Sequence, residues 1–212
     1  MQLALKQIIV SPGQQLLLKD ISWQQLETIL EELGESRAAK ISYSNGLLEI
    51  MTPLLEHEKD KEIISYLVQI LLEKLEIDFE ALGSTTYKNK KMNQAVEPDA
   101  SFYIKNCSTV IGKDRLDLSI DPPPDLAVEI DITSRTQFDN YLLLGVPELW
   151  KYTRKGLQIY LLQNSQYIQS KNSPNFPNIP IIELVDRTIE DSKKIGRSKA
   201  ISIFKNWLKT NL

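Results

Sequence analysis

Hydrophobic and polar residues alternate over the stretch DLAVEIDITS, which spans residues 125–134. In an extended strand this spacing places the aliphatic side chains on one face and the carboxylates of Asp125, Glu129 and Asp131 on the other. Carboxylates on one face repel one another, and burying them without partners costs free energy. The pattern therefore predicts a strand with one apolar face and one acidic face, and the acidic face needs an explanation.

A helix and a hairpin are predicted near the N-terminus. Ser22, followed three positions later by Gln25, is typical of a capping box, and Gly34 is a stop signal behind a run of apolar residues at helical spacing. Residues 39–51 form two alternating runs around an Asn-Gly dipeptide, the strongest short hairpin signal. The chain is therefore expected to begin with a helix followed by two antiparallel strands.

The middle of the chain alternates between helical and strand patterns. A second helix is predicted over residues 55–75, and its first turns, EHEKDKE, are polar. Short strands are expected at residues 79–82, 85–87 and 100–104. After the acidic strand, a short helix that begins near Phe138 and ends near Gly145 precedes the strands ELWKYT and LQIYLL. This order predicts a right-handed βαβ unit within a mixed sheet.

One domain is expected over residues 1–212, because this length suits a single sizeable core. We expect an α/β fold in which a central mixed β-sheet is flanked by helices. Its parts are an N-terminal helix and hairpin (about 1–52), a core (about 53–163) and a C-terminal extension (about 164–212). The extension begins with a loop rich in Asn and Pro and ends with an amphipathic helix.

Composition narrows the class of protein. The net charge of −3 and the pI near 5.4 lack the strongly basic signature of many nucleic-acid binders, although a local basic patch is compatible with them. Cys107 is the single cysteine, so no disulfide can form within the chain, as suits a reducing cytoplasm. Lys6 interrupts the short apolar run at the N-terminus and Pro12 follows it, so we expect neither export nor a membrane span.

Clustered carboxylates have two common explanations: they bind a hard divalent cation, or they pair with Lys and Arg of the same protein. Mg²⁺ prefers oxygen ligands and takes one or two protein carboxylates beside the phosphates of a substrate. A second acid, Asp99, follows Pro98 just before the predicted strand SFYI. Asp99 and Glu129 on neighbouring strands would suffice for such a site.

The Pro-Asp pair followed by the triplet Glu129-Ile130-Asp131 resembles the motif of the PD-(D/E)xK nuclease superfamily. A more specific set lies between residues 43 and 152: YSNGLLEIMTP, a helix that opens with EHEKD, VEPDASFYI, PPDLAVEI and YLLLGVPELWKY. Together these segments resemble the Uma-two family of restriction endonuclease-like proteins, and the resemblance covers about two thirds of the chain.

The resemblance implies a restriction-endonuclease-like core and a metal-dependent DNA endonuclease that hydrolyses phosphodiester bonds with Mg²⁺ or Mn²⁺. Asp99 and Glu129 would be the metal ligands. Glu58, near the start of the second helix, would complete the site, and Glu56 is an alternative on the same helix. DNA would be the substrate, and a homodimer would place two sites on one duplex.

The catalytic lysine is missing from its usual positions. It normally stands two residues after the second acid, where this chain has Asp131, and many members of the resembled family instead carry it in the next helix, where this chain has Gln137. Asp131 could act as a third ligand or a base. The positive charge could come from one of four residues, namely Lys88, Lys90, Lys91 or Arg135.

Three functional hypotheses remain open: an active endonuclease, a catalytically inactive nuclease-fold module that binds nucleic acid or a protein partner, and a metal-dependent hydrolase of another phosphoester. Each residue also has a structural interpretation. Asp99 could simply form a Pro-Asp turn, and the negative charge of Glu58 could interact favourably with the positive end of the helix dipole. His57, the single histidine, is more typical of a cap or packing residue than of a general base. Lys88, Lys90 and Lys91 form a basic cluster that suits phosphate contacts or a solvated turn.

Overall fold

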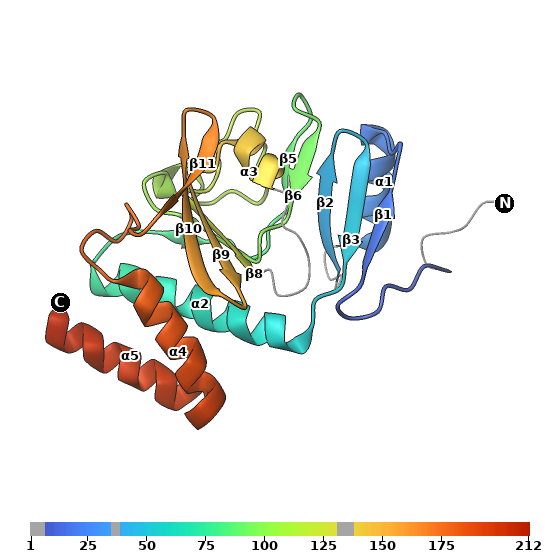
Figure 1. Cartoon of the computed structure of the whole chain (residues 1–212). Helices are drawn as coiled ribbons and strands as arrows, with labels where there is room; N and C mark the ends of the chain where they lie inside the picture. The colour runs from blue at the N-terminus through green and yellow to red at the C-terminus, as the bar shows by residue number, and fades with distance from the viewer. Residues whose placement is uncertain (1–6, 35–38, 131–137) are drawn as a thin grey trace.

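The computed structural model describes residues 7–34, 39–130 and 138–212. Two β-sheets lie side by side in it (Figure 1). The first sheet has five strands in the order β1-β3-β2-β6-β5, all antiparallel to their neighbours. These strands are β1 (Gln15–Leu18), β2 (Lys40–Ser44), β3 (Leu47–Met51), β5 (Tyr87–Asn89) and β6 (Gln94–Val96).

The second sheet has six strands in the order β11-β10-β9-β8-β7-β4. They are β4 (Glu80–Ala81), β7 (Ala100–Tyr103), β8 (Leu126–Ile130), β9 (Glu148–Thr153), β10 (Gly156–Gln163) and β11 (Gln166–Ser170). Strands β8 and β9 are parallel and the other pairs are antiparallel, so the sheet is mixed as predicted. Helix α3 (Phe138–Leu144) lies between β8 and β9 in the sequence, which confirms the strand, helix, strand order.

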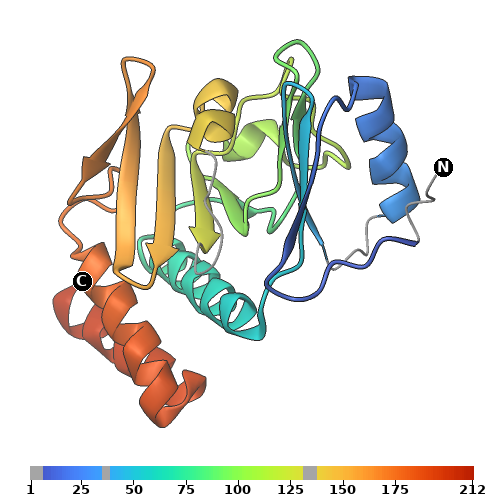
Figure 2. The same cartoon turned by 45° about the vertical axis from the view of Figure 1, so that its right-hand side comes forward.

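Helix α1 (Trp23–Leu33) covers the outer side of the first sheet (Figure 2). The predicted capping box is present: the Ser22 hydroxyl accepts the Gln25 N–H, and the Gln25 side chain accepts the Ser22 N–H. These bonds satisfy donors that the first turn of a helix leaves without partners. Leu26 then packs with Ile41 and Tyr43 of β2, so the helix is fixed on the hairpin.

Three helices cover one face of the second sheet: α2 (Leu55–Lys74), α4 (Ile181–Ile195) and α5 (Arg197–Asn211). In the turned view they lie below the sheet, with α4 and α5 at its end far from α1 (Figure 2). Their apolar stripes meet Trp150 of β9 and Ile159 of β10, both fully buried, in the main core. Within the described residues no helix has the length and apolar character needed to cross a bilayer.

Strand β8 confirms the alternation that the sequence predicts. Leu126, Val128 and Ile130 lie in the main core against the helices, whereas Ala127 belongs to a second core on the opposite face. All five residues of β8 are buried, because α2 covers one face, and residues of α3, β5 and β6 pack in the second core on the other. The acidic face of this strand is therefore inside the protein. The part of the alternation beyond residue 130 lies outside the described residues.

Several elements differ from the predictions. Strands β1, β6 and β11 and helix α4 were not predicted, and β5 begins at Tyr87 rather than ending there. The structure also corrects the interpretation of Asp125 as a solvent-facing residue at the start of a strand. Asp125 is buried, and its carboxylate accepts the backbone N–H groups of Ile104 and Asn106 at 2.7 and 3.0 Å. It stabilises the loop after β7.

Candidate active site

Lys40, Asp99 and Glu129 meet in the interior between the two sheets. The Lys40 Nζ atom is 2.8 Å from Asp99 Oδ1 and 2.8 Å from Glu129 Oε2. Lys40 opens β2 of the first sheet, Asp99 immediately precedes β7, and Glu129 lies in β8 of the second sheet. Both acids are almost fully buried, with exposures of 1% for Asp99 and 6% for Glu129. One ammonium group therefore serves two buried carboxylates.

The backbone of β8 fixes the position of Asp99. The Asp99 N–H donates to the Val128 carbonyl at 3.0 Å, and the Ile130 N–H donates to Asp99 Oδ2 at 2.7 Å. Pro98, just before Asp99, cannot continue a ladder because it has no N–H. The aspartate is therefore bonded to the strand on both sides of Glu129, which brings the two carboxylates together.

Glu129 is held from two directions. Its Oε2 atom accepts from Lys40, and its Oε1 atom accepts a hydrogen bond from the hydroxyl of Tyr141 in α3. Tyr141 is also buried, so this bond is shielded from water. The helix that follows β8 thus orients the glutamate.

Two hydrogen bonds hold β2 where Lys40 can reach the acids. The Ile41 N–H donates to Glu97 Oε2 at 2.9 Å, and Asn140 Nδ2 of α3 donates to Ser42 Oγ at 2.6 Å. Ile41 and Tyr43 face α1, so Lys40 and Ser42 lie on the opposite side of the strand, toward the second sheet. The polar face of the hairpin is therefore an internal contact between the two sheets.

His57 lies beside Asp99 at the start of α2. Its Nε2 atom is 3.2 Å from Asp99 Oδ2, and its Nδ1 atom is 3.4 Å from Glu58 Oε1. The histidine is 4% exposed, and neither ring nitrogen has a hydrogen-bond partner of acceptable geometry. Glu58 is partly exposed and also pairs with Lys61 at 3.0 Å. The single histidine of the chain is thus at the candidate site.

The charges of this cluster shift its pKa values. Burial opposes ionisation of Asp99, but the Lys40 ammonium, together with His57 and the Ile130 N–H, holds the pKa of that carboxyl well below its usual range. Burial raises the pKa of Glu129 to about 7, an increase that Lys40 opposes and the negative charge of Asp99 supports. Burial would lower the pKa of Lys40, yet the two acids raise it above its ordinary value. When both acids are ionised, this group of three carries two negative charges and one positive charge.

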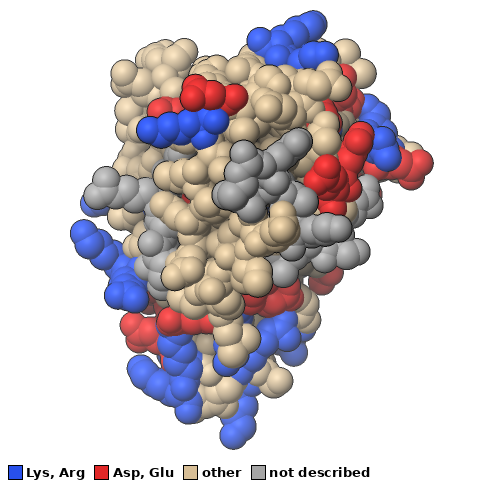
Figure 3. Space-filling model, turned by 90° about the vertical axis from the view of Figure 1, so that its right-hand side faces the viewer, with Lys and Arg blue, Asp and Glu red and all other residues tan. Residues whose placement is uncertain are grey.

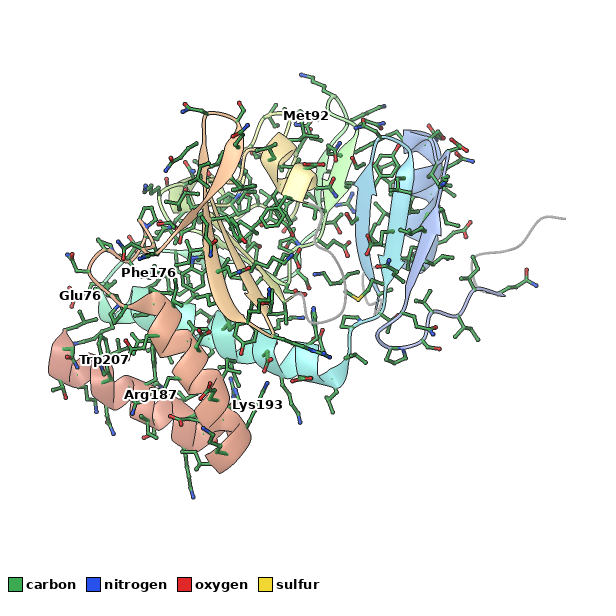
Figure 4. All side chains as sticks on the ribbon, in the orientation of Figure 1. Glu76, Met92, Phe176, Arg187, Lys193 and Trp207 are labelled. Carbon is green, nitrogen blue, oxygen red and sulfur yellow. The ribbon has the colours of Figure 1, made fainter. Side chains whose placement is uncertain are left out.

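The structure separates the predicted site residues into groups. Asp99 and Glu129 are brought together, and Glu58 approaches Asp99 through His57. Glu56 lies apart: it pairs with Lys193 of α4 at 3.0 Å, on the side of α2 that faces the C-terminal helices (Figure 4). Three further candidates, Asp131, Arg135 and Gln137, lie outside the described residues.

The predicted basic cluster is divided as well. Lys88 pairs with Glu27 of α1 at 2.8 Å, whereas Lys90 and Lys91 are exposed in the turn between β5 and β6, next to Met92 at the upper end of the molecule (Figure 4). On the face shown in Figure 3, basic and acidic side chains are interspersed over the lower half. That part of the surface carries charge of both signs.

Whether this cluster can bind a metal cation depends on the ligand atoms that its side chains supply. Across the described ranges, no three His, Cys, Asp or Glu side chains are already arranged as a metal-binding group. Asp99, Glu129 and His57 nevertheless supply carboxylate oxygens and imidazole nitrogens around a buried excess of negative charge. Hard divalent ions accept carboxylates, and transition metals accept imidazole as well. The donor set is therefore compatible with a divalent cation.

Sequence reasoning missed Lys40, Tyr141 and Glu97. Lys40 stands in a run, KISYS, whose polar positions resemble the exposed face of an ordinary hairpin. One feature of the sequence does indicate Lys40. The hairpin carries this lysine on its polar face, and the acidic strand around Glu129 needs a positive charge if it is buried. The sequence favours a cap or packing role for His57, whereas the structure places it beside Asp99.

Comparisons with known proteins agree with this architecture. The sequence profile of the Uma2 family, described as "Putative restriction endonuclease", matches residues 23–189. A solved structure described as "a putative nuclease belonging to DUF820 from Anabaena variabilis" is similar with a TM-score of 0.50 and 16% identity, over 76% of this chain and 93% of that chain. At this identity the likeness concerns the fold. No match was found among curated proteins.

Proposed function

The chain belongs to the Uma2 family, and from this premise we propose that it is a metal-dependent DNA endonuclease of the PD-(D/E)xK type in which Lys40 replaces the missing lysine. The observation that carries the proposal is the position of the Lys40 ammonium, 2.8 Å from both Asp99 and Glu129. The motif needs one aspartate, one further acid and one lysine at a single point. All three are present here, although the lysine comes from the other sheet.

The charge balance of the cluster supports a catalytic rather than a structural role. A structural ion pair is most stable when the charges match, because each uncompensated buried charge costs several kcal/mol. Here two buried carboxylates share one ammonium, and the pKa of Glu129 is raised to about 7 by burial and by Asp99. A divalent cation held by Asp99 and Glu129 would offset the excess negative charge.

When bound, such a cation would supply Lewis-acid polarisation of a phosphoryl oxygen and a more acidic bound water. Residues of the chain would stabilise the developing charge and keep the acids in position. Lys40 would stabilise negative charge that develops on the phosphoryl oxygens, since an ammonium in a water-poor site acts strongly on such charge. Tyr141 would keep Glu129 in one orientation, and Glu97 would keep the start of β2 in place.

DNA binding and a homodimer are part of the proposal. Exposed Lys90 and Lys91 suit contacts with the phosphate backbone, which position a duplex without reading its sequence. Lys88 is a weaker candidate because it is already paired with Glu27. A two-fold dimer would place one site on each strand of a duplex.

One observation favours a second function, a catalytically inactive module that keeps the nuclease fold. Both acids already have an internal partner in Lys40, and a buried ion-pair network can serve only to specify a fold. Such a module would bind nucleic acid or a protein partner. Turnover experiments separate the two proposals.

The test is plasmid cleavage by purified protein with Mg²⁺ or Mn²⁺. We expect nicking by the wild-type protein, no cleavage by Glu129→Ala, and a loss of about 10²-fold or more for Lys40→Met, which keeps the length of the side chain and removes its charge. Lys113→Met is the matched control, because Lys113 pairs with Asp121 on an exposed loop. Circular dichroism verifies that each variant is folded.

Folded Lys40→Met that cleaves at the wild-type rate would refute the role of this lysine. Wild-type protein that binds DNA and cleaves none with either metal would support the inactive module instead.

A further inference from the structure

His57 is a buried polar residue without an ordinary structural role. It occupies the first turn of α2, yet the N-cap of this helix is Leu54 and no side chain forms a capping hydrogen bond there. Both ring nitrogens are buried, and neither forms a hydrogen bond of good geometry, although each lies near a carboxylate oxygen. A buried polar group that is poorly satisfied destabilises the fold, so this histidine is suited to a further partner.

The two ring nitrogens face two different carboxylates. Nε2 lies 3.2 Å from Asp99 Oδ2, and the geometry is too poor for a hydrogen bond. Two ligands of one cation, each about 2.1 Å from it and at right angles, stand roughly 3 Å apart. The separation of Nε2 from Asp99 Oδ2 is therefore that expected for two neighbouring donors to one cation.

The other nitrogen, Nδ1, lies 3.4 Å from Glu58 Oε1. A histidine that ligates a metal through one nitrogen typically offers its other ring N–H to a carboxylate, which fixes the tautomer and the ring orientation. Glu58 stands in that position. Its partial exposure and its pair with Lys61 leave it on the outer side of the histidine.

We propose that His57 Nε2 adds a nitrogen ligand to the metal site of Asp99 and Glu129 and makes this site prefer transition-metal ions such as Mn²⁺ to Mg²⁺, with Glu58 as a positioning residue behind the histidine. This inference rests on the metal site of the proposed function and goes further, because it assigns a nitrogen ligand and a metal preference. Imidazole suits transition metals, whereas Mg²⁺ prefers oxygen alone. Glu58 thereby acts through His57 instead of touching the metal.

The test uses the fact that the chain has one histidine. Pulsed electron paramagnetic resonance of tag-free wild-type protein loaded with Mn²⁺ is expected to show the ¹⁴N coupling of a bound imidazole, which can come only from His57. The coupling should vanish in His57→Gln. Absence of ¹⁴N coupling from the bound Mn²⁺ in the wild-type protein would overturn the proposal without any variant.

Calorimetric titration adds the metal preference. His57→Gln should weaken Mn²⁺ binding by about 10-fold or more and Mg²⁺ binding by less than about 3-fold, and Glu58→Gln should weaken Mn²⁺ binding less than His57→Gln does. Lys113→Met again serves as the control and should bind both metals like the wild type. Equal losses for both metals in His57→Gln would contradict a selective nitrogen ligand.

The outcomes separate this inference from the proposed function. Mn²⁺ with ¹⁴N coupling in a protein that cleaves no DNA would support the histidine ligand and refute the endonuclease. DNA cleavage with Mn²⁺ that shows no ¹⁴N coupling would support the endonuclease and refute the histidine ligand.

Discussion

Glu129→Gln is expected to stabilise the metal-free protein at alkaline pH while it abolishes cleavage. The substitution removes the excess negative charge of the buried cluster and keeps the size of the side chain. The amide oxygen can still accept from Lys40, and the amide nitrogen can donate to the hydroxyl of Tyr141, because a hydroxyl is both donor and acceptor. At low pH, where Glu129 is itself protonated, the two proteins should differ little.

The direction of this stability change follows from the linkage between proton binding and folding. The pKa of Glu129 rises from 4.5 to about 7 on folding, chiefly through burial, so the folded state holds a proton that the unfolded state has released. This contribution to stability is complete below pH 4.5 and is lost as the pH rises through 7. At 1.36 kcal/mol per pKa unit the loss is about 3 kcal/mol. The pKa of Asp99 is lowered, so its own contribution is lost only in stronger acid.

Urea denaturation at pH 5 and pH 8 in the presence of a chelator measures the effect. Between these values the wild-type protein should lose about 2–3 kcal/mol relative to Glu129→Gln, which corresponds to a relative fall in Tm of roughly 4–12 °C for a chain of this length. Groups common to both proteins cancel in the comparison. Parallel pH profiles for the two proteins would refute the argument that Glu129 carries a buried excess charge.

Two further predictions concern residues away from the site. Asp125→Ala should lower the free energy of unfolding by about 1–3 kcal/mol, because the partly buried N–H groups of Ile104 and Asn106 lose their buried acceptor, and the specific cleavage rate of the folded protein should stay unchanged; a stability change below 0.5 kcal/mol in urea would contradict the structural role of this carboxylate. Gly156→Ala should destabilise by about 1–3 kcal/mol in the same assay, since Gly156 has a φ of +93° and an added Cβ would lie 2.5 Å from Asp186 Oδ2; a Tm equal to that of the wild type would show that this turn relaxes freely.

The sequence was most informative where structure is set by neighbours along the chain. The capping box at Ser22, the Asn-Gly hairpin and the alternation of β8 each depend on residues a few positions apart, and each is confirmed. Helix α4 carries a comparable signal in its sequence, because its buried residues recur at helical spacing. The strand β6 is only three residues long and contains Gln94, so its pattern is too short to predict a buried strand.

The candidate site was only half predictable for a physical reason. Asp99 stands just before β7 and Glu129 lies on the neighbouring strand β8, and each belongs to a short motif that can be recognised from nearby residues. Lys40 reaches them through the contact of two sheets, and that contact depends on Glu97 and Asn140, which bond to β2 from other elements. No local pattern encodes such a meeting. The correction at Asp125 has the same origin, because the backbone groups that it binds, at Ile104 and Asn106, are distant from it in the sequence.

Lys40 and Glu129 are far apart in the sequence, so they leave the ribosome at different times during synthesis. The lysine leaves the ribosome first, and the glutamate that it contacts follows 89 residues later. At a synthesis rate of about 5–20 residues per second this interval is on the order of 10 s. Tyr141, which orients the glutamate, follows 12 residues after that. A nascent chain therefore cannot hold the complete cluster until both sheets exist, so the proposed DNA-cutting activity would appear only with the finished tertiary contact.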